Sequence, residues 1–293
     1  MRVTDRSVFQ AGNAGIAAAR DRSQEAQRVA STGLRVERPG DDPAASGVLA
    51  AAPIAEARFR AIGAAASAAS GELQSADQSL SEVSNALARA QQLAVQFSNS
   101  TYTGPQRAGG AAEVESLIAG VVLELNTQVA GRYVFGGTSD ATPPFGPSGA
   151  YQGAAQARSV EVAPGVFQAS SIRADVAMGA GGGVDVPGTL AELRDALAAN
   201  DPDRVAATIE ALKASIDQVS SARAEGGVAM NALDTAAAAS SLAADDVKSH
   251  AAHLADADYV DAATQLAFSQ RALEASYAAT AQSFKLTLLD YLR

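Results

Sequence analysis

Apolar residues recur at alternating spacings of three and four along much of this chain. From Phe59 to Phe97 nearly every third or fourth residue is apolar, and many of these positions are alanine. This spacing places the residues along one face of a long helix, as in a coiled coil. Turn-forming residues at 99–105, with Pro105 among them, end the helix. A second stripe from Val114 to Val129 predicts another helix, which returns beside the first.

Helical spacing appears again in the second half of the chain. Leucines at 190, 193 and 197 and a stripe from Val205 to Val219 predict two helices, the later one capped by Asp201 with Pro202 at its first position. A last long helix is predicted from about Asn231 to Leu292, with a three-and-four seam from Tyr259 to Tyr291. Both ends of the chain are therefore expected to be helical.

The middle of the chain has a different pattern. Prolines and glycines are frequent from 133 to 153, which excludes helix there. Farther on, two β-leaning runs at 158–162 and 166–172 flank Ala163-Pro164-Gly165, the composition of a hairpin turn.

Together these patterns predict a mainly α fold with a β-rich insertion. The expected architecture is an elongated antiparallel helical bundle or coiled-coil rod built from both termini, with a small β domain in the middle. The predicted segments are a terminal assembly segment at 1–40, two halves of the helical rod at 41–132 and 189–264, a β-rich outer domain at 133–188, and a terminal assembly helix at 265–293.

Composition and charge exclude several classes of function. Roughly a quarter of the 293 residues are alanine, and aromatic residues make up 5%, so the core must be light. Cysteine is absent, which excludes disulfides and thiolate chemistry. The net charge of −10 argues against a nucleic-acid partner and against binding to anionic membranes. Neither a cleavable secretory signal nor an apolar run long enough for a membrane helix is evident.

The two ends of the chain bury little by themselves. Residues 1 to about 35 carry a thin stripe of Phe9, Ile16, Ser23 and Ala30, too small to offset the entropy of ordering a helix. Near the other end, apolar residues between Leu286 and Leu292 crowd both faces of the last turns. We therefore expect the terminal segments to be disordered in the monomer and to order on assembly with neighbouring subunits.

Candidate chemistry is sparse. His250 and His253 lie at i and i+3 near Asp245, Asp246, Asp256 and Asp258, a set that offers Zn²⁺ imidazole and carboxylate ligands, or else forms a solvated polar face. The favoured interpretation is the solvated face, with no metal and no cofactor. A Ser-His-Asp hydrolase would need a nucleophile elbow of the Gly-x-Ser-x-Gly type, which is absent, so the chain is not expected to be an enzyme.

A series of motifs resembles the flagellin-related axial proteins of the bacterial flagellum. The run from Ala30 to Pro43 matches their N-terminal signature in its Asp-Asp-Pro form, although Gly40 replaces the usual serine. Further similar segments follow in the same order, and they are closer to the members found at the hook-filament junction than to filament flagellin. These segments are Arg107 with 113–117, 126–137, 143–145, 151–153, 256–259, 273–277 and 288–292.

The resemblance implies a structural protein that leaves the cell through the flagellar type III apparatus with an uncleaved signal. It would form a homo-oligomeric ring outside the cell, between hook-associated protein 1 and flagellin, after a chaperone has held its C-terminal helix. In this family the β domain faces outward and the terminal helices line the inner tube. The alternatives are a small flagellin that forms the filament itself and an intracellular coiled-coil scaffold.

The loop at 35–43 is expected to be a loop-to-helix junction in which Asp42 caps the helix that Pro43 begins. Arg35 and Arg38 beside Asp41 and Asp42 either form local ion pairs or reach across a subunit boundary, and the sequence leaves both open. The residues predicted to contact other subunits are Phe9, Ile16, Arg35, Arg38, Asp41, Asp42, Tyr277, Phe284, Leu288, Leu289, Tyr291 and Leu292.

Overall fold

The computed structural model describes the backbone of residues 5–291 and the side chains of Ser7 and of 9–282. The chain divides into two compact units. One contains residues 58–243, and the other combines the two ends, up to residue 57 and from residue 244 onward. Residues within each unit contact one another more than they contact the other unit. The division into five segments that the sequence suggests stays a prediction.

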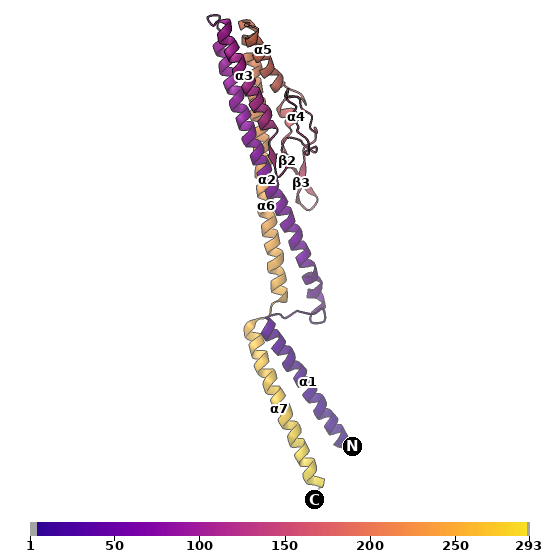
Figure 1. The fold of residues 1–293 in the computed structure, drawn as a ribbon. Helices are drawn as coiled ribbons and strands as arrows, with labels where there is room; N and C mark the ends of the chain where they lie inside the picture. Colours follow the sequence, from indigo (N-terminus) through magenta and orange to yellow (C-terminus); the bar gives the residue numbers. More distant parts are fainter. Residues whose placement is uncertain (1–4, 292–293) are drawn as a thin grey trace. The chain divides into compact units, whose positions relative to one another are not determined.

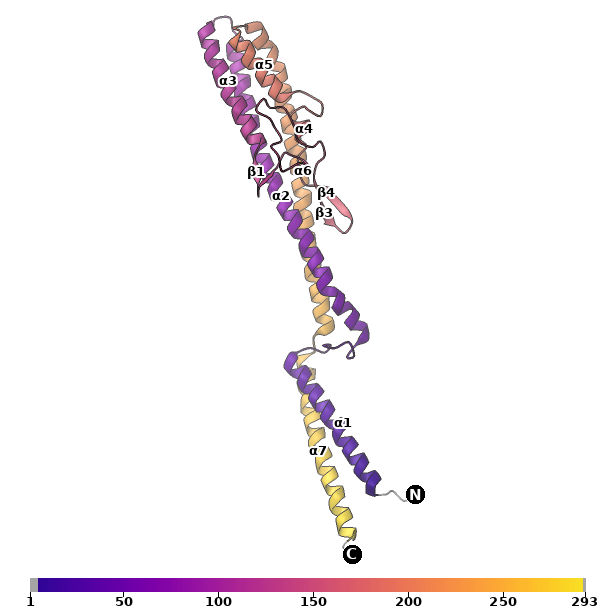
Figure 2. The same ribbon diagram turned by 45° about the vertical axis from the view of Figure 1, so that its right-hand side comes forward.

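Two long helices form the backbone of the central unit. Within 58–243, helix α2 (Pro43–Phe97) and helix α6 (Pro202–Ala255) run side by side in opposite directions (Figures 1 and 2). Arg223 Nε donates to Asp77 Oδ1 at 2.7 Å, and a Cβ added to Gly63 would lie 3.4 Å from Ser240 Cβ. The small residues along the seam thus allow close approach of the two helices.

The predicted seam of α2 is confirmed. Its members from Ile62 to Phe97 are buried, whereas Phe59 is half-buried. Helix α3 (Gly104–Leu125) returns beside α2 as predicted, and Arg89 of α2 pairs with Glu113 of α3 at 2.7 Å. The predicted stripe is wrong at its end, because the helix stops at Leu125 and Val129 lies in a strand. Helix α5 (Val186–Ala198) packs on α3 and places its leucines 190, 193 and 197 in the same core. The four helices α2, α3, α5 and α6 therefore share one hydrophobic core.

In the last third of the chain, the predicted start of the first helix is right, but the predicted boundary between the two helices is in the wrong place. Arg204 N donates to Asp201 Oδ1 at 3.1 Å, so Asp201 caps α6 as expected. Helix α6 then continues without interruption to Ala255, and the helix predicted from Asn231 to Leu292 is divided at residues 256–258. The break occurs there because Asp258 Oδ1 accepts the backbone N–H of Val260 at 2.8 Å and so caps helix α7 (Tyr259–Tyr291).

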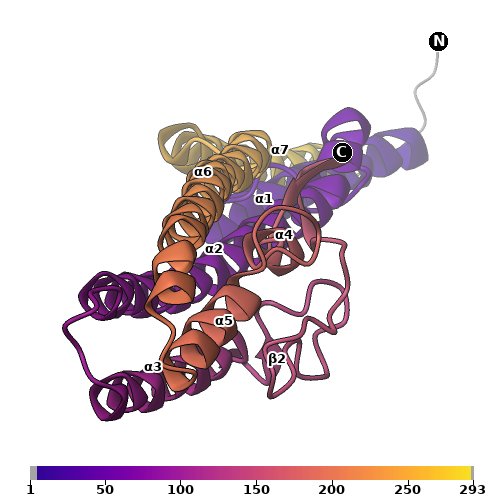
Figure 3. The same cartoon turned by 90° about the horizontal axis from the view of Figure 1, so that it is seen from above.

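The strand-bearing segment lies beside α5 on one side of the helix cluster (Figure 3). It contains two antiparallel hairpins, β1 (Gln128–Val129) with β2 (Arg132–Tyr133), and β3 (Ser159–Ala163) with β4 (Val166–Ala169). The second is the hairpin predicted around Pro164, and Gly165 in its turn has a φ of 78°. Turns, loops and the short helix α4 (Ala174–Ala177) make up most of the segment, so it holds less strand than its pattern predicted.

Charged and polar side chains attach this segment to the helices. Arg158, next to β3, pairs with Glu72 of α2 at 2.6 Å and with Asp140 at 3.1 Å, and Arg132 also pairs with Glu72. Gln218 of α6 donates to the carbonyl oxygens of Ala177 and Val184. The segment is thus fixed to both long helices by specific side chains.

In the unit formed by the two ends, helix α1 (Asp5–Thr32) packs on α7 (Figure 1). The connector that follows α1 pairs with the segment between α6 and α7. Leu34 forms an antiparallel bridge with Asp256, and Ala257 N donates to the carbonyl oxygen of Gly33 at 2.8 Å. Backbone hydrogen bonds therefore join two connecting segments that are far apart in the sequence.

Candidate assembly interface

The α1–α7 pair has a shallow seam. The side chains that α1 turns toward α7 are mostly small, and a Cβ added to Gly12 would lie 3.2 Å from Thr280 Cγ2. Among the described side chains of the two helices, Ala262 alone is buried. Two helices that bury so little against each other gain little stability from their packing.

Large apolar side chains of the same pair remain exposed. The exposed fraction runs from 46% for Tyr277 to 78% for Tyr259, and Phe9, Val260 and Phe268 fall between these values. A groove of about 830 Å³ lies between the helices, and Ala26, Val29, Phe268 and Ala272 supply much of its lining. An exposed apolar surface of this kind is typical of a site where another protein packs.

The predicted seam of the C-terminal helix is right at every second member. Leu266, Leu273 and Thr280 of that seam are half-buried. Tyr259, Ala263 and Gln270 are exposed, and the neighbouring positions Ala262 and Ser269 are buried or half-buried in their place. The prediction placed the aromatic residues at 259 and 277 in the seam. The close approach of α1 instead requires small residues to face it. The aromatic rings are consequently left on the outer face.

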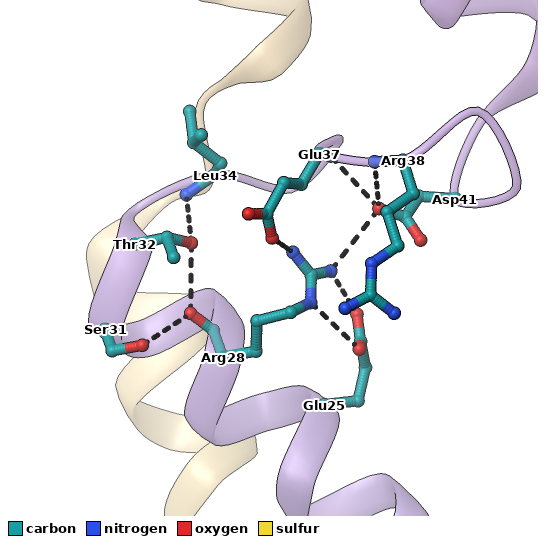
Figure 4. A network of polar contacts seen from close by, with 8 residues as sticks. All are labelled: Glu25, Arg28, Ser31, Thr32, Leu34, Glu37, Arg38 and Asp41. Atoms are coloured by element: carbon teal, nitrogen blue, oxygen red, sulfur yellow. Dashed lines mark hydrogen bonds and ion pairs between the residues drawn. The ribbon is translucent and has the colours of Figure 1, made fainter.

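A compact ionic network holds the connector after α1 (Figure 4). Arg28 lies at its centre: Nη1 donates to Glu37 Oε2 at 2.6 Å, Nε donates to Glu25 Oε2 at 3.1 Å, and Nη2 is 3.4 Å from Asp41 Oδ2. The hydrogen bonds to Glu25 and Glu37 raise the pKa of Arg28, and the bond from Arg28 lowers the pKa of Glu25. One guanidinium therefore joins the last turns of α1 to the middle and to the end of the connector.

The two aspartates that end the connector have separate roles. Asp41 Oδ2 accepts the backbone N–H groups of Arg38 at 2.9 Å and Glu37 at 3.0 Å, and these bonds lower its pKa. Asp42 Oδ1 accepts the N–H of Ala45 at 3.1 Å, which confirms the predicted cap of α2. That bond, followed by the one from Arg35, lowers the pKa of Asp42.

Arg35 forms local contacts within the chain, one of the two arrangements that the sequence leaves open. Its guanidinium pairs with Asp42 at 3.1 Å and donates to the carbonyl oxygen of Leu254 at 2.9 Å. These contacts tie the connector to the last turn of α6 within one chain. Arg38 contributes its backbone N–H to the loop, and its side chain is exposed.

The remaining predicted contact residues divide by position. Phe9, half-buried Ile16 and Tyr277 belong to the α1–α7 pair. Phe284, Leu288, Leu289, Tyr291 and Leu292 lie outside the residues whose side chains are described. Sequence reasoning missed Arg28, the centre of the network. Its signal was the Glu25/Arg28 pair at i and i+3 on one helix face, shortly before the loop at 35–43.

The histidines of α6 do not gather a ligand set. In the part of the chain that the structure describes, no group of three or more histidine, cysteine, aspartate or glutamate side chains is placed to hold a metal ion. Across the same residues, no helix combines the length and the apolar character that crossing a membrane requires.

Two family models match the chain. The bacterial flagellin N-terminal helical region matches residues 7–140, and the bacterial flagellin C-terminal helical region matches residues 209–292. No protein in the curated set matches the sequence significantly.

Solved structures share the fold. One from Vibrio parahaemolyticus, assigned as a flagellar hook-associated protein, superimposes with a TM-score of 0.66 at 24% identity over 74% of this chain and 100% of its own. FlgL from Bacillus cereus gives a TM-score of 0.57 at 24% identity, covering 69% of this chain and 97% of its own. Hook-associated protein-3 from Legionella pneumophila gives 0.58 at 14% identity, covering 67% and 96%.

Proposed function

Since this chain belongs to the flagellin-related family of bacterial proteins, we propose that it is a structural subunit of the flagellum at the junction between hook and filament. The observation that carries this assignment is the fold shared with hook-associated proteins, over almost the full length of those structures. The protein acts by packing and not by catalysis.

The terminal helices are the assembly elements in this proposal. Among the described side chains of the α1–α7 pair Ala262 alone is buried, and Phe268 and Tyr259 are exposed. Such a pair gains more from neighbouring subunits than from itself. Neighbours in a ring would cover the outer faces of the two helices. The helices would then be ordered chiefly in the assembled state, and the predicted contact residues Phe9, Ile16 and Tyr277 belong to this surface.

The remaining parts of the proposal concern export and partners. The chain leaves the cell through the flagellar type III apparatus without cleavage, after a chaperone has held its C-terminal helix. It then forms a homo-oligomeric ring, with hook-associated protein 1 on the hook side and flagellin on the filament side. The connector at 33–42 lies beside the surface that would be shared, because it joins α1 to the rest of the chain.

Deletion of the gene in its host, combined with localisation, tests the proposal. We expect the deletion strain to release flagellin into the medium and to carry hooks without filaments, and we expect antibody to label only the boundary of hook and filament in the wild type. Labelling along the whole filament would instead identify a small flagellin, and purified chain would then polymerise without limit when seeded. Retention of the protein in the cytoplasm would favour the intracellular coiled-coil scaffold.

A further inference from the structure

Helix α6 carries a second apolar seam on the side opposite its core. Val228, Ala232, Thr235, Ala239 and Leu242 follow spacings of four and three, and all five are exposed, with exposed fractions of 71% for Val228 and 66% for Leu242. The buried seam of the same stretch includes Leu233 and Ser240. At 100° per residue the two seams lie on opposite sides of the helix. The central unit leaves the outer seam uncovered.

Helix α2 repeats this arrangement. Ala66 and Ala69 are buried against the central unit, whereas Ala61, Ala64, Ala68 and Gly71 form an exposed seam on the opposite side. The outer seam of α6 therefore combines large and small apolar side chains, whereas the outer seam of α2 consists of small residues alone. Small side chains on one helix admit the larger Val228 and Leu242 of another.

The charges beside the two outer seams are opposite in sign. Residues 224–244 of α6 contain Glu225 and Asp234 and no lysine or arginine. Residues 57–71 of α2 contain Arg58 and Arg60 and no acidic residue. Arg58 pairs with Glu161 at 3.0 Å and still leaves 58% of its side chain exposed. The acidic border of one seam thus complements the basic border of the other.

We propose that the outer seam of α6 (Val228 to Leu242) packs on the outer seam of α2 (Ala61 to Gly71) of a second copy of this chain. The contact is heterologous, because each copy uses a different surface on either side, and such contacts close into a ring where the rotation between copies closes. This proposal rests on the proposed function and names how the central units of neighbouring subunits meet. A contact of this length is below the size of a stable standalone interface, so single copies separate when dilute.

The register follows from the fold. Within one copy, Gly63 lies beside Ser240, and Asp77 pairs with Arg223. Residues at the same height along the antiparallel pair therefore have numbers that add up to about 300. Copies related by rotation about a ring axis share the same levels. Leu242 of one copy is therefore expected near Ala61 of the next, and Ala239 near Ala64.

Disulfide trapping tests this contact directly, because the chain has no cysteine of its own. Three double variants carry Leu242→Cys with Ala61→Cys, Ala64→Cys or Ala68→Cys, which covers neighbouring registers. Flagella isolated from cells with each variant as the sole copy are oxidised and separated without reductant. At least one pair should give a ladder of dimers, trimers and larger products, and an equal mixture of the two single variants should stop at dimers.

The controls separate this proposal from the proposed function. Leu123→Cys on the exposed face of α3, combined with Leu242→Cys, should give no ladder. The contact would be overturned if the variants are present in flagella but no pair gives a ladder, or if Leu242→Cys alone gives dimers. Either outcome would leave the proposed function standing. Absence of the unaltered chain from flagella would overturn the function. The same oxidation of concentrated purified full-length chain then decides the contact, a ladder supporting it and monomers alone refuting it.

Substitution gives a second readout. Leu242→Glu adds a charge of the same sign as the border, and the side chain is exposed, so the helical circular dichroism should not change. We expect the amount incorporated into flagella to fall about tenfold or more. Leu123→Glu, equally exposed on α3, should leave incorporation unchanged. Equal incorporation of both variants would contradict the proposed contact.

Discussion

The guanidinium of Arg107 donates to Asn200 Oδ1 at 2.7 Å and so joins two chain reversals of the central unit. Arg107 begins the second turn of α3, and Asn200 lies between α5 and α6 with a φ of 55°. The same buried guanidinium donates to the carbonyl oxygens of Phe97, Asn99 and Tyr102 at 2.8–3.0 Å. All four acceptors lie at the end of the bundle where α2 turns into α3.

Replacement of Arg107 should therefore destabilise the central unit. Arg107→Met removes every donor and leaves several buried oxygens unpaired, so we expect a loss of about 3 kcal/mol in the free energy of unfolding. Urea denaturation followed by circular dichroism measures it. Arg89→Met is the matched control, because the exposed pair with Glu113 should contribute under about 1 kcal/mol. Equal losses for the two variants would contradict the role given to Arg107.

Two adjacent glycines of α3 should respond oppositely to alanine. A Cβ at Gly110 would lie 2.5 Å from Phe97 Cε2, whereas nothing lies within 4 Å of one at Gly109. Gly110→Ala should cost about 1–3 kcal/mol through overpacking. Gly109→Ala should stabilise the helix by up to about 1 kcal/mol. Thermal unfolding of both variants measures the difference, and stabilisation by both would show that the aromatic ring moves aside freely.

The connector should loosen in acid. The pKa values of Asp41 and Asp42 are lowered from 3.8, and that of Glu25 from 4.5, by the hydrogen bonds that each carboxylate accepts. A lowered folded-state pKa gives stability that is present above the ordinary value and is lost as pH falls through the lowered value. Protection factors of the Glu37 and Arg38 amides, corrected for intrinsic exchange, should fall below about pH 4.

Asp41→Asn provides the control for that titration. The amide still offers an oxygen to the Glu37 and Arg38 N–H groups, but it does not titrate, so their protection should lose its dependence on Asp41. Protection of Ala45, whose N–H bonds to Asp42, should keep its acid dependence. Constant protection of all three amides in the wild type from neutral pH to pH 3 would contradict this assignment.

Hydrogen-deuterium exchange on the dilute full-length chain tests the state of its ends. We expect residues 1–32 and 265–293 to exchange about 100-fold or more faster than the core of the central unit, because the α1–α7 pair buries so little. In isolated flagella the same peptides should become protected. Uniform protection in the dilute chain would mean that the ends fold without partners.

Removal of 288–293 should separate folding from assembly. This segment lies beyond the described side chains, and its sequence is rich in leucine, so its loss should remove apolar contacts between subunits. The unfolding of the central unit should be unchanged, while incorporation into flagella should be lost. A truncated chain that assembles as well as the full one would show that these residues are dispensable.

The seam from Ile62 to Phe97, the caps at Asp42 and Asp201, and the hairpin around Gly165 could be predicted from sequence alone. Each depends on local chemistry: helical periodicity, a side-chain oxygen before a proline, or a residue that tolerates positive φ. These features require nothing from distant parts of the chain. The family resemblance also followed from such motifs and was confirmed at both ends of the chain.

Other features were decided by contacts between residues far apart in sequence. The continuity of α6 through 220–230 and its end before Asp258 depend on its packing in the central unit and on the bridge between Leu34 and Asp256. The phase of α7 depends on which face α1 approaches, and Tyr259 is exposed for that reason. Arg28 and Arg107 became central because the fold brings acceptors from other segments around them. Periodicity determines the type of each element, but the choice of partner for each face is a property of the tertiary structure.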